Sequence, residues 1–178
     1  AHRLRIGFFG DGPWARNALE LLHNDPDLEL AFVALRSRQP DAVLQRKAVG
    51  FGLPHVQPAN INADEYFHWA SGQKCDLFVS MSFDQIFKKR IIDMPPLGTI
   101  NCHAGKLPWY RGRNVLNWVL INDENEFGIT VHSMDEGIDT GDIILQAAYP
   151  ITDVDDYASL LNTAHTECAR LLYQAIHM

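Results

Sequence analysis

The 178-residue chain has few cysteines and no long apolar segment. No apolar run reaches the roughly 20 residues needed to span a bilayer, so no membrane-spanning helix and no membrane partner are predicted. The three cysteines, Cys75, Cys102 and Cys168, are odd in number and show no paired spacing. We therefore expect reduced thiols, which are typical of a cytoplasmic protein.

Positive charge is also scarce, since the formal net charge is -7. An acidic balance disfavours non-specific binding to nucleic acid, because phosphate contacts need a basic surface. It does not exclude a small anionic substrate, which needs only a local positive site. The G-x-S-x-G motif of serine hydrolases is missing. Cys102, His103, His132 and Asp139 match no zinc-binding spacing, so no metal is expected.

Apolar strand patterns and amphipathic helix patterns alternate along the chain. This alternation predicts a mostly parallel sheet with helices on both faces, which is a Rossmann-like α/β fold. The last helix has the clearest pattern, and Asp155 and Asp156 suit its N-terminus. The predicted strands are residues 4–9, 28–35, 76–80, 98–102, 127–134 and 143–149, and the predicted helices are residues 15–23, 41–50, 64–71, 114–121 and 157–176.

Residues 1–178 are predicted to form a single domain. The length suits one domain with a substantial core, and the sequence contains no internal repeat or low-complexity linker. The final residues, Tyr173 to Met178, stop inside a predicted helix without a capping signal. We therefore expect the native chain to continue beyond residue 178.

A glycine-containing loop, residues 10–15, connects the first predicted strand to the first helix. It fits the pattern G-x-G-x-x-A, which in this context is typical of dinucleotide binding. Arg36 and Arg38 near the end of the second strand would suit a phosphate, so an NADP-binding oxidoreductase is one alternative. Pro13 removes a backbone donor that phosphates usually need. A plain turn of small residues, or another anion site at the helix N-terminus, remains open.

A second group of polar residues suits acyl transfer. Asn101 and His103 alternate along one predicted strand, so their side chains share a face. Asp139 follows in a loop bounded by Gly137 and Gly141. The histidine could transfer protons, the amide could donate to an oxyanion, and the carboxylate could set the tautomer of the histidine. The alternative is structural, because Asp-rich turns are common and a lone histidine more often stabilises the fold.

Three segments carry a resemblance to a known family. Residues 97–112, 127–132 and 135–143 resemble the signature of the folate-dependent N-formyltransferases. The resemblance covers nearly the whole chain and is densest from 97 to 146. It implies the N-terminal catalytic domain of such an enzyme, with 10-formyltetrahydrofolate as the formyl donor.

The resemblance also implies roles for individual residues. Asn101, His103 and Asp139 match the catalytic residues of the family. Asn101 would stabilise the oxygen anion, His103 would assist proton transfer, and Asp139 would tune His103 or an ordered water. Folate contacts are implied for Gln85, Phe87 and Ile92 on one wall of the pterin pocket and for Asp135 and Ile138 on the other.

Within the family, residues 10–15 and 110–118 look most similar to dTDP-amino-sugar N-formyltransferases. Such enzymes formylate a nucleotide-linked 3- or 4-amino-dideoxyhexose used in bacterial surface polysaccharides, and a 4-amino-4,6-dideoxyhexose is our first expectation. A small C-terminal region in these enzymes helps to hold the nucleotide and pair subunits, which implies a homodimer. The residues implied to contact the sugar nucleotide are Gly12, Trp14, Lys106 and Tyr110.

Methionyl-tRNA formyltransferases are the alternative within the family. They resemble the chain from Met134 to Asp142, but they carry a basic, glycine-rich insertion after the second strand. Here Arg36 passes to Asp41 without it. The acidic charge also argues against tRNA as a partner.

Overall fold

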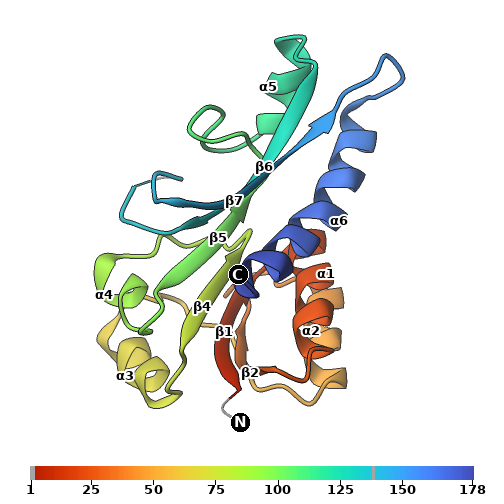
Figure 1. Ribbon diagram of the computed structural model, residues 1–178. Coiled ribbons are helices and arrows are strands. Elements are labelled where there is room, and N and C mark those ends of the chain that lie inside the picture. Colours follow the sequence, from red (N-terminus) through yellow and green to blue (C-terminus); the bar gives the residue numbers. More distant parts are fainter. Residues whose placement is uncertain (1–2, 138) are drawn as a thin grey trace. The chain divides into compact units, whose positions relative to one another are not determined.

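The computed structural model describes residues 3–137 and 139–178 (Figure 1). The chain divides into two compact units, the first ending at Ile100 and the second running from Asn101 to Met178. The boundary falls inside strand β5 (Thr99–His103), so this strand begins in the first unit and ends in the second. Among the described residues, none of the helices is long and apolar enough to cross a membrane.

The first unit is a parallel sheet with helices on both of its faces. Its strands pair in the order β3-β2-β1-β4, and every described pair is parallel. Helices α1 and α2 cover one face, and α3 and α4 lie on the other (Figure 1). The elements are β1 (Leu4–Gly10), α1 (Gly12–His23), β2 (Leu28–Ala34), α2 (Ala42–Gly50), β3 (His55–Val56), α3 (Asp64–Gly72), β4 (Leu77–Met81) and α4 (Lys89–Ile92).

An aromatic cluster fills the core of the first unit. The ring of Phe9 on β1 contacts Phe32 and Phe78 edge-on, with ring centroids 5.5 Å and 5.1 Å apart. All three side chains are fully buried. Phe87 adds a further edge-on contact to Phe9 at 5.0 Å. Strands covered on both faces explain why β1, β2 and β4 read as continuous apolar runs.

The second unit combines the end of β5 with an antiparallel pair and two helices. Strand β6 (Glu126–Ser133) pairs with β7 (Ile143–Pro150). Helix α5 is Val115–Ile121, and the long helix α6 is Tyr157–Ile176. Helix α6 packs on β6, β7 and α5 through a stripe of buried residues that repeats at helical spacing.

Helix α6 begins at a capping box. The Asp156 carboxylate accepts a hydrogen bond from the Ser159 N–H, and the Ser159 hydroxyl accepts one from the Asp156 N–H. These bonds satisfy backbone donors that have no partner within the first turn. The predicted acidic N-terminus of this helix is therefore present.

The α/β fold class is confirmed, and each predicted strand and helix is present within a few residues. The largest difference is in α1, which begins at Gly12 rather than at Ala15. Pro13 lies in its first turn, where a missing N–H costs no hydrogen bond. Two short elements, β3 and α4, were not predicted.

Candidate active site

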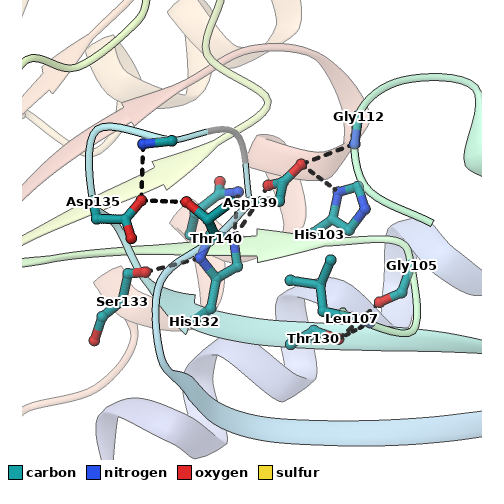
Figure 2. A network of polar contacts seen from close by, with 12 residues as sticks. His103, Gly105, Leu107, Gly112, Thr130, His132, Ser133, Asp135, Asp139 and Thr140 are labelled. Carbon is teal, nitrogen blue, oxygen red and sulfur yellow. Dashed lines mark hydrogen bonds and ion pairs between the residues drawn. The ribbon is translucent and has the colours of Figure 1, made fainter. Parts of the chain in front are cut away.

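The candidate catalytic residues all belong to the second unit. Asn101 and His103 lie on β5, and Asp139 lies in the connection between β6 and β7. His132, near the end of β6, joins them, although the sequence did not single it out as catalytic. Figure 2 shows the carboxylate of Asp139 beside the rings of His103 and His132.

Asp139 lies between two imidazole rings. Its Oδ1 is 3.2 Å from Nε2 of His132, and its Oδ2 is 3.5 Å from Nδ1 of His103. Oδ2 also accepts a hydrogen bond from the Gly112 N–H at 3.1 Å. The three side chains are 12%, 2% and 10% exposed for Asp139, His132 and His103, so little water competes for these contacts. The structure thus brings together His103 and Asp139, the histidine and the carboxylate that the sequence predicted to act together.

The far nitrogen of each ring contacts a backbone carbonyl. Nε2 of His103 is 2.6 Å from the Tyr110 oxygen, and Nδ1 of His132 is 2.9 Å from the Ser133 oxygen. A carbonyl only accepts, so these nitrogens must carry protons. In the neutral tautomers, Nδ1 of His103 and Nε2 of His132 therefore present lone pairs beside Asp139. A proton taken up by either ring would be held at the nitrogen that faces the carboxylate.

Asn101 joins the cluster through His132. Its Nδ2 lies 3.3 Å from Nε2 of His132, the atom that also faces Asp139. The Asn101 side chain is half-buried. The Asn101 amide is held by His132 and is partly accessible, so its NH₂ group can donate a hydrogen bond to a substrate oxygen.

The surroundings of Asp139 favour its charged form. Burial alone would raise the pKa of this carboxyl, but three contacts together outweigh burial: His132, whose ring donates to Asp139 when it carries a second proton, the nearby His103 and the N–H of Gly112. The pKa of Asp139 is therefore lowered from its ordinary value, and the group is a carboxylate at neutral pH.

Local backbone features place these side chains. The register of β6 and β7 shifts between Val131 and His132, and such irregularities re-aim side chains at sheet edges. Asp139 has φ 52, a left-handed conformation that Asp tolerates better than most residues. A Cβ on Gly141 would lie 1.6 Å from the Ser133 oxygen, so only glycine fits there.

Gly105 is a second residue whose role was not predicted from the sequence. A Cβ at this position would lie 2.5 Å from Nε2 of His103 and 2.5 Å from the Tyr110 oxygen. The hydrogen bond between those two atoms therefore requires a residue without a side chain at position 105. The sequence offered two signals for it, namely its place two residues after His103 and its position within segment 97–112, which resembles the family signature.

The variant Gly105→Ala is expected to displace the His103 ring and to lower the free energy of unfolding by about 1–3 kcal/mol, the usual cost of overpacking. Urea unfolding measures the change. Gly50→Ala is the matched control, because a Cβ there meets nothing within 4 Å and Gly50 ends a helix. Equal stability of the two variants would contradict the steric account of Gly105.

Lys106 and Tyr110, predicted as sugar-nucleotide contacts, both bind acidic side chains of the same unit. Lys106 Nζ is 2.6 Å from Glu126, and the Tyr110 hydroxyl donates to Glu124 at 2.6 Å. The bond to Glu124 raises the pKa of Tyr110. The Tyr110 hydroxyl and one N–H of the Lys106 ammonium are therefore already engaged within the unit.

The predicted folate contacts have different surroundings. Asp135 is exposed and accepts hydrogen bonds from the Gly137 N–H and the Thr140 hydroxyl, as a turn residue does. Thr140 is the largest cause of its lowered pKa. Ile138 lies outside the described residues.

The other predicted folate contacts belong to the first unit. Gln85 Oε1 accepts a hydrogen bond from the Ile61 N–H, and Gln85 Nε2 donates one to the Pro58 oxygen. Phe87 and Ile92 are buried in the first unit.

The glycine loop offers no free cation at Arg36. This side chain binds Asp11 at 3.4 Å and Asp84 at 3.2 Å, so its charge is already neutralised. Gly12 has φ +67 and begins α1, and Trp14 is half-buried in the first turn. The NADP alternative needs an arginine for the 2′-phosphate, and the pairing of Arg36 leaves the exposed Arg38 as its remaining candidate.

A metal centre was the weakest alternative for these residues. Within residues 3–137 and 139–178, no group of three or more His, Cys, Asp or Glu side chains is placed to hold a metal ion. Cys102 instead donates to the Cys168 carbonyl at 3.5 Å.

Solved structures share the fold. The glycinamide ribonucleotide transformylase 1 of Symbiobacterium toebii superposes with a TM-score of 0.83 at 23% identity, covering 99% of this chain and 87% of that one. The phosphoribosylglycinamide formyltransferase of Bacillus halodurans gives 0.83 at 21% identity, covering 97% and 93%. At these identities the similarity concerns the fold alone.

Sequence relatives and a family model are more specific. The methionyl-tRNA formyltransferase of Syntrophus aciditrophicus is 38% identical over 99% of this chain and 59% of its own length. That of Citrifermentans bemidjiense is 41% identical over 70% of this chain and 39% of its own length. The chain thus spans at most about three fifths of these relatives. The family model described as "Formyl transferase" matches residues 11–176. The chain belongs to the formyl transferase family.

Proposed function

We propose that this chain transfers a formyl group from 10-formyltetrahydrofolate to a primary amine at Asn101, His103 and Asp139. The supporting observation is the carboxylate of Asp139 between two imidazoles whose far nitrogens are committed to backbone carbonyls. This arrangement supports Nδ1 as the atom of His103 at which a proton is gained or lost. Membership of the formyl transferase family supports the folate donor.

In the proposed reaction, the amine nitrogen attacks the formyl carbon and forms a new C–N bond. The carbonyl oxygen becomes an anion, to which Asn101 donates a hydrogen bond. His103 accepts the proton of the attacking amine and holds it at Nδ1, the nitrogen that faces the Asp139 carboxylate. The bond between the formyl carbon and the folate nitrogen then breaks, and that nitrogen receives the proton.

The first acceptor that we propose is methionyl-tRNA, because the relatives compared above are named methionyl-tRNA formyltransferases. A dTDP-linked 4-amino-4,6-dideoxyhexose is the second candidate. The short connection from β2 to α2, residues 35–41, and the net charge of -7 favour a small substrate over tRNA. The relatives compared above are not named as sugar formyltransferases, so their names do not support the sugar acceptor or a role in surface polysaccharides.

The acceptor is tested with the full-length protein and 10-formyltetrahydrofolate. Methionyl-tRNA and dTDP-4-amino-4,6-dideoxyglucose are supplied separately, and each is analysed by mass spectrometry for added formyl. Formyl-methionyl-tRNA formation that weakens with salt supports the first candidate. Formylation of the sugar alone replaces it with the second. Transfer to neither acceptor contradicts both.

Replacing Asn101 by alanine is expected to lower kcat by about 10²–10³-fold, the usual cost of losing one donor to an oxyanion. Steady-state kinetics with the preferred acceptor measure the loss. Asn162→Ala, on an exposed position of α6, is the matched control and should keep wild-type kinetics. An Asn101→Ala variant as active as the control removes this residue from the mechanism.

A further inference from the structure

Gln146 on β7 is bonded to the loop that follows β5. It lies opposite Thr130 on β6 in the register of the two strands. Its Nε2 donates to the Leu107 oxygen at 2.9 Å and to the Thr130 hydroxyl at 2.8 Å. The orientation of the amide follows from chemistry, because a carbonyl oxygen requires a donor.

The Thr130 hydroxyl completes this network. It is fully buried, and it donates to the Gly105 oxygen at 2.7 Å while accepting from the Leu107 N–H at 3.3 Å (Figure 2). It also accepts from Gln146. One donor and two acceptor sites are all that a hydroxyl has, so its capacity is used in full. Gln146 and Thr130 together fix both polar backbone groups of Leu107 and the carbonyl of Gly105.

The same loop supplies two backbone contacts to the candidate active site. Three residues after Leu107, the Tyr110 oxygen accepts from Nε2 of His103. Gly112 then donates its N–H to Asp139. Tyr110 has φ 55, a left-handed conformation that the chain would leave easily if the loop were released.

We propose that Gln146 is a positioning residue for formyl transfer, which holds the loop so that the Tyr110 oxygen selects the Nε2–H tautomer of His103. This inference rests on the proposed role of His103. Gln146 donates to Leu107 and Thr130 rather than to His103 or Asp139, so it acts through the backbone of residues 105–112. A purely structural Gln146 would affect stability but not the tautomer of His103.

The test compares Gln146→Met, which keeps the size of the side chain without its donors, with the exposed control Gln174→Met on α6. Ring ¹⁵N chemical shifts report the His103 tautomer without any substrate. In the full-length protein, kcat and KM are measured with 10-formyltetrahydrofolate and each of the two acceptors named above. The expected result is a mixture of His103 tautomers and a kcat lower by about 10²-fold with little change in KM, as expected for a misplaced catalytic group.

An unchanged tautomer and unchanged kcat in Gln146→Met overturn the proposal. If that variant does not fold, Gln146→Asn replaces it, since its shorter amide cannot reach both acceptors, and the same two outcomes decide. His103→Ala is measured alongside. An active His103→Ala contradicts the proposed function itself, whereas an inactive His103→Ala beside a fully active Gln146→Met contradicts only the role of Gln146.

Discussion

Replacing Asp139 by asparagine is expected to lower formyl transfer by about 10⁴-fold, the loss seen when an asparagine replaces the carboxylate that orients a catalytic histidine. The amide introduced at position 139 would carry no charge to attract a proton on His103 or His132. Its NH₂ group would instead donate a hydrogen bond to one of these rings in its neutral form. His103 would then no longer face a carboxylate at Nδ1. Steady-state kinetics with circular dichroism measure activity and folding together.

Asp153→Asn is the control for this variant, because Asp153 is exposed in the same unit. The lowered pKa of Asp139 adds a second readout. A carboxyl whose folded pKa is depressed stabilises the fold above its unfolded pKa of about 3.9, and this stability is lost as pH falls through the folded pKa. The stability difference between wild type and Asp139→Asn should therefore shrink below about pH 4. A difference independent of pH would contradict the assigned contacts.

Replacing His103 by alanine is expected to lower kcat by about 10²–10⁴-fold, the usual contribution of a general acid–base group. The ring is buried, so its removal leaves a cavity beside Asp139 and the Tyr110 oxygen. Added imidazole should enter this cavity and restore part of the activity. Titration of His103→Ala with imidazole measures the rescue.

His68→Ala, on an exposed position of α3, is the control for the histidine variant and should keep wild-type turnover. A His103→Ala enzyme that folds and retains full activity would exclude His103 as the proton carrier. Loss of activity without rescue, in a folded variant, would instead indicate that the ring supports the loop at Tyr110.

The sequence predicted the main elements because their signals are local. Apolar runs buried on both faces mark β1, β2 and β4, and the helical stripe of α6 is long enough to be unambiguous. Strand β3 has only two residues and α4 only four, which is too short for any periodicity to be visible. The start of α1 was misplaced because Gly12 and Pro13 are usual turn residues.

Site residues could be predicted from the sequence pattern only where they lie close together in the chain. Alternation on β5 placed Asn101 and His103 on one face, and the family resemblance added Asp139. His132 and Gln146 could not be assigned, because their roles depend on contacts with Asn101 and Leu107, which are distant from them in sequence. Lys106 was predicted as a substrate contact from the family resemblance, and its ion pair with Glu126 depends on how residues 20 positions apart approach each other.

The most direct test of the account is transfer of labelled formyl from 10-formyltetrahydrofolate to an amine by the full-length enzyme and its Asp139→Asn variant, followed by mass spectrometry of the acceptor. The account predicts rapid labelling of methionyl-tRNA, or of the dTDP-amino sugar, by the wild-type enzyme and almost none by the folded variant. Equal labelling by both enzymes, or no labelling of any amine by the wild type, would contradict it.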